Sequence, residues 1–89
     1  MEKITFTPAW NGGVFSPELS NGDLVEIHIE GRFPRIERTN IVAVETTEVD
    51  PENGPYSFVD YRVTLSNQIS TVMLADALQN RPNLTFYKV

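Results

Sequence analysis

The ten residues from Leu24 to Phe33 have the sequence LVEIHIEGRF, which is the clearest structural pattern in the chain. Apolar and polar side chains alternate here, and successive side chains of a β-strand point to opposite faces. We therefore expect one long strand with a buried face and a solvated face. Pro34 ends this strand because proline lacks the backbone N–H that a sheet requires. The face expected to be buried consists of Val25, Ile27, Ile29, Gly31 and Phe33.

Two more strands are expected after Pro34, joined as a β-hairpin. The third strand covers residues 36–49, where Val, Ile and Thr are frequent. The fourth covers residues 58–65, and the cluster of Pro, Asn and Gly between the two is typical of a turn. Alternation in the fourth strand predicts inward side chains at Val59, Tyr61, Val63 and Leu65 and outward ones at Asp60, Arg62 and Thr64.

The N-terminal quarter of the chain predicts one short strand followed by a long loop. Ile4 and Phe6 alternate with polar residues, as in a strand with one buried face. Residues 8–23 then contain repeated Gly, Pro and Asn, which favour turns. Within this loop we expect Val14 and Phe15 to point inward.

The C-terminal part predicts the only helix and a last strand. Residues 66–80 have helical periodicity, and Ser66 or Ser70 can cap the N-terminus. Residues 85–89 form a strand with a single charged side chain, and an open edge of that kind invites pairing with another chain. The helix face expected to be buried consists of Met73, Leu74, Ala77 and Leu78.

This order of elements predicts a single mainly β (α+β) domain over residues 1–89. Its centre is a small antiparallel sheet of about five strands, with one helix before the last strand. The segment Glu18–Ile27, ELSNGDLVEI, resembles the diverging turn of SH3-like small barrels. The resemblance covers these ten residues alone and implies a sheet rolled or partly closed into an SH3-like barrel. The chain lacks the paired tryptophans with which such domains bind proline-rich peptides, so the resemblance indicates topology and no function.

The composition restricts the classes of function. The chain has no cysteine, which excludes disulfides and thiolate metal sites. Twelve acidic against seven basic residues give a net charge of −5, which disfavours direct binding to nucleic acid or to an anionic membrane. No apolar run approaches the roughly 18 residues of a membrane span, and the first six residues do not have the pattern of a signal peptide. We expect a cytoplasmic protein that uses no cofactor.

No catalytic constellation is legible in the sequence. Nucleophilic catalysis needs a Ser, Thr or Cys beside an oriented base, and His28 is the only histidine. The glycines at 12 and 13 lack the following helix and Lys of a phosphate-binding loop. We therefore expect that the protein is not an enzyme.

Glu26, His28 and Glu30 are weak candidates for a metal site. In a strand they project from one face at intervals of about 6.5–7 Å, and a His with carboxylates can begin such a site. A solvated charged face explains the same pattern, and a protonation-sensitive contact of His28 is a third interpretation. Residues 50–54 contain residue types that bind calcium, but they lack the ligand spacing of an EF-hand.

The candidate binding residues are aromatic or acidic and lie in expected loops or in the hairpin. Trp is enriched at binding hot spots, but a single Trp in a small domain also anchors loops on the core. Acidic residues along the hairpin suit either a solubilising surface or a row that imitates nucleic acid. The tentative binding set is Trp10, Tyr56, Glu48, Asp50 and Glu52.

We therefore expect a small accessory or inhibitory protein, of a size typical of bacterial or phage proteins, that binds another protein non-covalently. One alternative is an acidic DNA-mimic inhibitor of a nucleic-acid-binding enzyme, and another is an oligomer that sequesters a small ligand. A homo-oligomer, most simply a dimer, is expected from the small core and the last strand. Its interface should use an edge strand or the Trp10 and Tyr56 loops, because like charges would meet if the acidic hairpin paired with itself.

Overall fold

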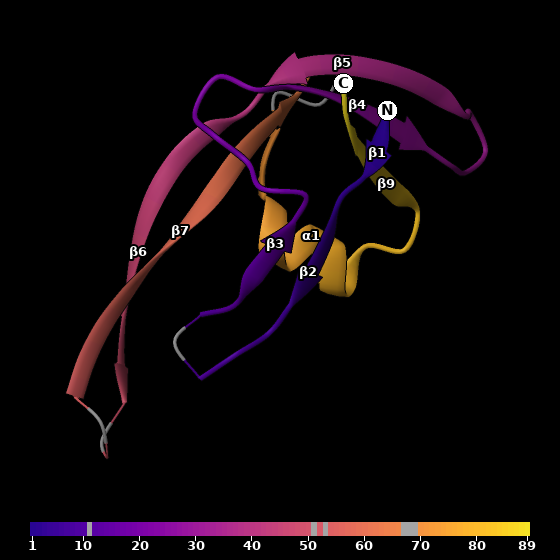
Figure 1. Cartoon of the computed structure of the whole chain (residues 1–89). Coiled ribbons are helices and arrows are strands. Elements are labelled where there is room, and N and C mark those ends of the chain that lie inside the picture. The colour runs from indigo at the N-terminus through magenta and orange to yellow at the C-terminus, as the bar shows by residue number, and fades with distance from the viewer. Residues whose placement is uncertain (11, 51, 53, 67–69) are drawn as a thin grey trace.

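The computed structural model describes residues 1–10, 12–50, 52, 54–66 and 70–89. The expected mainly β architecture with antiparallel sheets and a helix before the last strand is confirmed (Figure 1). The elements are β1 (Glu2–Lys3), β2 (Thr5–Thr7), β3 (Val14–Ser16), β4 (Leu24–Ile29), β5 (Arg35–Asn40), β6 (Val42–Asp50), β7 (Gly54–Leu65), β8 (Ser70–Met73), α1 (Leu74–Asn80) and β9 (Leu84–Lys88).

The strands of the described residues form three sheets. One has the order β1-β9-β4-β5, the second pairs β2 with β3, and the third has the order β6-β7-β8. The sheets do not join into a closed barrel within the described part of the chain. The barrel closure that the resemblance at Glu18–Ile27 implies is therefore not found among the described residues.

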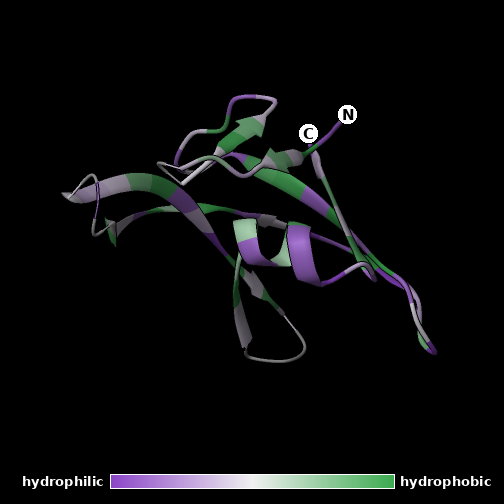
Figure 2. Ribbon diagram, turned by 90° about the horizontal axis from the view of Figure 1, so that it is seen from below, coloured by the Kyte–Doolittle hydropathy of each residue, from purple (hydrophilic) through white to green (hydrophobic). Residues whose placement is uncertain are grey.

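The core lies between the inner face of the four-stranded sheet, the base of β7 and α1. Ile27 of β4 is paired with Phe86 of β9, and neither side chain has any exposed surface. The buried face expected for the second strand is confirmed at Val25, Ile27 and Ile29. Figure 2 shows the resulting pattern, in which strands carry alternating hydrophobic and hydrophilic residues.

The expected second strand is too long at its C-terminal end. β4 ends at Ile29, and Phe33 is 78% exposed in the connection to β5. Gly31 has a φ of 147°, which an extended strand does not use. The chain therefore turns several residues before Pro34.

The expected third strand is two strands in different sheets. Ile41 separates β5 from β6 and is fully buried. Its N–H donates to the carbonyl of Asp23, and its carbonyl accepts from the N–H of Gly22. Because Ile41 hydrogen-bonds to this turn and not to a strand, the chain crosses from one sheet to the next at this residue. The expected pairing of the third and fourth strands is confirmed as the β6–β7 hairpin.

The fourth strand changes its buried face halfway along. Tyr61, Val63 and Leu65 are buried as expected, but Val59 is 51% exposed and Asp60 is 5% exposed, so these two assignments were wrong. The base of β7 packs on the core, whereas Asp60 points toward the N-terminus of α1. Adjacent side chains of one strand are therefore both buried where the hairpin passes between core and helix.

The long N-terminal loop contains a strand that the sequence pattern missed. β3 pairs with β2, and Phe15 lies against Phe6 with ring centroids 4.8 Å apart. Phe15 points inward as expected, but Val14 is 64% exposed because neighbouring strand residues face opposite sides.

The helix begins at Leu74, later than expected, and neither Ser66 nor Ser70 caps it. Residues 70–73 form β8 instead, and 67–69 lie outside the described residues. The carboxylate Oδ1 of Asp60 accepts the N–H of Ala75 at 3.1 Å, so β7 supplies the cap. Leu74 and Ala77 are buried as expected, and Leu78 is partly buried against the core.

The last strand does not form an open edge. β9 lies between β1 and β4 and pairs with both. The edge on which we based the expectation of a homo-oligomer is therefore filled within the chain itself.

The molecule is elongated because one hairpin projects from its body. Its principal extents are 45, 24 and 21 Å, and the outer ends of β6 and β7 lie far from the four-stranded sheet (Figure 1). No helix within the described residues is long and apolar enough to cross a membrane.

Candidate functional site

An aromatic pair lies where the β2–β3 loop meets the projecting hairpin. The ring of Trp10, from the loop, contacts the ring of Tyr56, from β7, with centroids 5.8 Å apart and planes inclined by 73°. Trp10 remains 68% exposed in this position. Of the two interpretations that the sequence left open, the structure therefore places Trp10 on the surface and not in the core.

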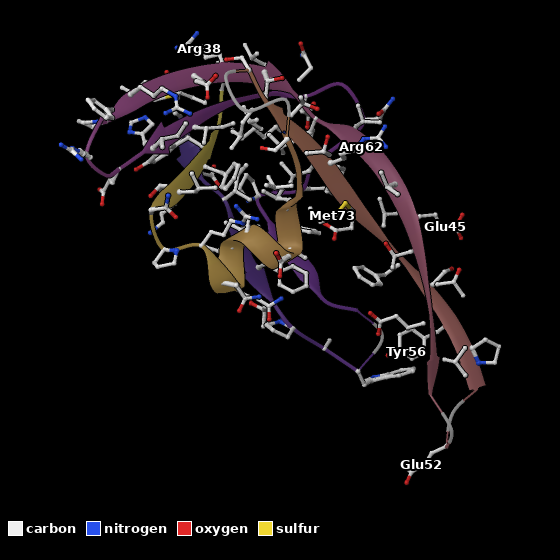
Figure 3. The ribbon with its side chains drawn as sticks, turned by 180° about the vertical axis from the view of Figure 1, so that it is seen from behind. Arg38, Glu45, Glu52, Tyr56, Arg62 and Met73 are labelled. Atoms are coloured by element: carbon white, nitrogen blue, oxygen red, sulfur yellow. The ribbon has the colours of Figure 1, made fainter. Side chains whose placement is uncertain are left out.

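The register of the hairpin places the aromatic residues on one face. Tyr56 pairs with Glu48 and Phe58 pairs with Thr46, so both aromatic side chains face the same side. Figure 3 shows Tyr56 on the side of the hairpin that faces the β2–β3 loop.

Glycine allows the loop to reach this face. Gly12 has a φ of 116°, and a Cβ added to it would overlap the ring of Phe58. Only glycine combines this backbone conformation with so close an approach to a side chain. Gly12 therefore sets the position from which Trp10 reaches Tyr56.

The structure brings Glu48 into the same site. The hydroxyl of Tyr56 donates a hydrogen bond to Oε2 of Glu48 at 3.1 Å, and Glu48 is exposed. Glu52 is also exposed, and it lies at the outer end of the hairpin (Figure 3). The backbone of Asp50 belongs to β6, but its side chain lies outside the described part. Three of the five tentative binding residues, Trp10, Tyr56 and Glu48, are thus in one cluster.

The charge of the molecule is concentrated on this hairpin. Residues 42–60, which we call the acidic arm, contain five acidic and no basic side chains. The rest of the chain contains seven of each, so the arm carries the whole net charge of −5. Sequence inspection found these acids but not that they share a projecting hairpin with Tyr56, or that Trp10 contacts this hairpin from the β2–β3 loop.

Two of the three candidate metal residues, Glu26 and His28, belong to an ion-paired cluster on the four-stranded sheet. Oε2 of Glu26 lies 2.8 Å from Nε2 of His28, and Nε of Arg38 donates to Oε1 of Glu26 at 3.0 Å. The hydrogen bond with His28, and then that with Arg38, holds the pKa of Glu26 below its ordinary value. Glu30 lies beyond the end of β4 and does not join them. Among the described residues, no three His, Cys, Asp or Glu are placed to hold a metal ion.

Two members of this cluster were missed by sequence reasoning. Arg38 lies opposite Glu26 in the β4–β5 register, and Tyr87 lies opposite it in the β4–β9 register. The rings of His28 and Tyr87 are 4.6 Å apart. No local pattern signals these contacts, because they depend on which strands pair. Glu26 is 8% exposed, and its carboxylate is already engaged by two donors, which suits a structural ion pair.

Comparison with known proteins does not supply a family. No family model, no curated protein and no solved structure matches the chain. An exposed indole beside a projecting hairpin that carries a phenol and several carboxylates can bind a complementary surface, whereas His28, the only histidine, lies in β4 of the four-stranded sheet.

Proposed function

We propose that the chain is a small accessory or inhibitory protein that binds another protein non-covalently. Its contact surface consists of Trp10, Tyr56 and Glu48 together with the outer end of the acidic arm. The observation that carries this proposal is the exposure of Trp10, 68%, in a position fixed against Tyr56. Trp and Tyr dominate binding hot spots, because they bury a large area at a small cost in conformational entropy.

The arm favours a partner with a basic surface. Exposed Glu48 lies beside the aromatic pair, exposed Glu45 lies on the opposite face of the hairpin, and the sequence of the arm contains no Lys or Arg. Such a charge distribution accelerates encounters with a positively charged partner and opposes encounters with acidic ones. The partner surface should therefore combine a pocket for the indole with Lys or Arg side chains around it.

The second candidate is an acidic inhibitor that imitates nucleic acid. The concentration of the net charge on the acidic arm favours it. Against it, Glu45 pairs with Val59 and Glu48 pairs with Tyr56, and positions three apart on a strand face opposite sides. A single row of carboxylates on one face, as a phosphate backbone would present, does not result. Competition by duplex DNA for the partner distinguishes the two candidates.

The geometry favours a different protein over a second copy of this chain. Tyr56 belongs to the acidic arm and Trp10 contacts it, so a two-fold contact through these two residues would bring like charges together. A homo-oligomer, including one that sequesters a ligand, stays a prediction that light scattering tests against the chain mass of 10.1 kDa.

Affinity capture with matched variants tests the proposal. Wild type, Trp10→Ala and Phe33→Ala are immobilised and exposed to lysate of the native cells, and captured proteins are quantified by mass spectrometry. Phe33 is the control because it is 78% exposed at the β4–β5 connection, remote from the arm. We expect a captured protein that is lost with Trp10→Ala and kept with Phe33→Ala. Equal capture by all three, or equal loss with both variants, would contradict the proposal.

A further inference from the structure

β6 is a long edge strand. It contains nine residues, Val42–Asp50, and pairs with β7 alone among the described strands. Its register runs without a bulge from the Val42–Arg62 pair to the Asp50–Gly54 pair. Proteins usually blunt such an edge with lysine, proline, a bulge or a covering segment, and β6 has no lysine and no proline.

One hydrogen bond at the base of the hairpin shows which backbone groups of β6 face the open edge. The N–H of Ala43 donates to Oδ1 of Asn21 at 2.9 Å, and Asn21 lies outside the hairpin. The N–H and C=O of Ala43 therefore point away from β7. In an antiparallel pair the N–H and C=O groups of successive residues point alternately toward and away from the partner strand. The N–H and C=O groups of Glu45, Thr47 and Val49 therefore also point away from β7. Asn21 covers the edge at Ala43, and beyond it no described strand pairs with this edge.

The side chains beside this edge define what can pair with it. Glu45 and Glu48 are exposed on opposite faces of the hairpin, and Val49 is 75% exposed. An added strand would place its own side chains alternately on these two faces. Basic residues three positions apart would then meet Glu45 on one face and Glu48 on the other. A second copy of β6 would instead bring the same carboxylates to a shared edge, where like charges are unfavourable.

We propose that β6 accepts an extended segment of a partner protein with Lys or Arg about three residues apart, which pairs along Glu45–Val49 and extends the β6-β7-β8 sheet. This inference rests on the proposed function, because it names how the same partner docks. Main-chain hydrogen bonds would supply affinity, and the two glutamates would select basic sequences.

Proline substitutions on the two edges of the hairpin provide a matched test. Thr47→Pro removes an N–H that points to the open edge and does not pair with β7. Ser57 of β7 lies directly opposite Thr47. Its N–H points away from β6, to the edge of β7 that pairs with β8 only at residues 62–65. Ser57→Pro therefore makes the same chemical change in the same residue pair but leaves the β6 edge intact. Circular dichroism of both variants serves as the control for retention of the β structure.

The probe is a capped nine-residue peptide with lysine at its third and sixth positions and valine and threonine elsewhere. Its binding to wild type is followed by NMR through the amide shifts of residues 45, 47 and 49, with a glutamate-for-lysine peptide as the control. We expect Thr47→Pro to weaken binding by at least about fivefold, since one backbone hydrogen bond is lost and the ring obstructs the edge, and Ser57→Pro to change it by less than about twofold.

The outcomes separate this inference from the proposed function. If the peptide shifts the Trp10 side chain but not the β6 amides, or if both proline variants bind alike, the edge is not the docking element. In those cases the surface at Trp10 stands and this inference fails. If the peptide shifts neither, the inference fails as well, and capture by wild type against Trp10→Ala then decides the proposed function by itself.

Discussion

The indole of Trp10, in the β2–β3 loop, meets the phenol of Tyr56, in β7, edge to face with ring centroids 5.8 Å apart. The contact fixes the orientation of the indole, yet two thirds of Trp10 stays in contact with solvent. A large aromatic side chain that is held in place and left exposed is the arrangement of a binding anchor. Substitutions at Trp10 and at Gly12 distinguish a role of this pair in binding from a role in stability.

Trp10→Ala should destabilise the fold only slightly. An exposed aromatic pair contributes about 0.5–1.5 kcal/mol beyond the area that it buries. Leu74→Ala is the comparison, because Leu74 is fully buried and such truncations cost about 2–5 kcal/mol. Urea unfolding measures both. A cost for Trp10→Ala equal to that for Leu74→Ala would show that the indole is a structural element.

Gly12→Ala should separate the loop from the hairpin. The added Cβ would overlap the ring of Phe58, so the loop must move and the contact of Trp10 with Tyr56 should be lost. Gly22→Ala is the matched control: Gly22 also has a positive φ, 88°, but its Cβ would meet nothing within 4 Å. Nuclear Overhauser contacts between the two rings should disappear in the first variant and persist in the second. Their persistence in both would show that Gly12 does not position Trp10.

Asp60 should act as a helix cap, and burial should favour the uncharged form of its carboxyl group. Its Oδ1 accepts the N–H groups of Tyr61 at 2.7 Å and Ala75 at 3.1 Å. Asp60→Asn keeps an acceptor and should preserve stability at neutral pH, whereas Asp60→Ala should cost about 1–2 kcal/mol. Equal losses in urea unfolding of the two variants would show that the charge, and not the acceptor, is required.

The same residue predicts a pH dependence with a definite sign. Burial raises the pKa of Asp60 above its ordinary value of 3.8, so the folded state holds this proton more tightly than the unfolded state. The protonated carboxyl group of Asp60 therefore contributes its full share to the free energy of unfolding below pH 3.8. This contribution is lost as the pH rises through the pKa of the folded state. As the pH rises from 3.8 through the folded-state pKa, the free energy of unfolding of Asp60→Asn should increase relative to that of wild type. A gain in the opposite direction would contradict the burial argument.

The contribution of Glu26 to the free energy of unfolding should depend on pH in the opposite direction to that of Asp60. The hydrogen bonds with His28 and Arg38 lower the pKa of Glu26 from 4.5. The ionised carboxylate of Glu26 therefore contributes to the free energy of unfolding above pH 4.5, and this contribution is lost as the pH falls through the pKa of the folded state. The stability advantage of wild type over Glu26→Gln should therefore shrink on acidification. Arg38→Gln removes one of the two donors and should reduce the same advantage. An advantage that does not vary with pH would mean that the ion pairs do not form in solution.

Local patterns predicted the parts of the fold that depend on neighbouring residues. The alternation in Leu24–Phe33 located Val25, Ile27 and Ile29 in the core because burial in a strand recurs at every second position. The turn cluster after Val49 located the hairpin for a similar local reason. By contrast, the break at Ile41 and the central place of β9 depend on partners distant in sequence.

The candidate site was predictable in its residue types but not in its assembly. Trp10, Tyr56 and Glu48 were singled out because aromatic and acidic side chains are suited to binding. Their meeting depends on Gly12 approaching Phe58, a long-range contact that no spacing rule reveals. The cap supplied by Asp60 was missed for the same reason, since a strand side chain serves a helix that begins 14 residues later in the chain.

The most direct test of the central claim uses the fact that the chain has a single tryptophan. Protein labelled with 5-fluorotryptophan should give one fluorine resonance, which reports on residue 10 alone. When the protein captured by wild type is added in stoichiometric amounts, we predict that this resonance shifts or broadens as the complex forms. A complex whose formation is shown by light scattering, with the fluorine resonance unchanged, would contradict the claim that Trp10 contacts the partner.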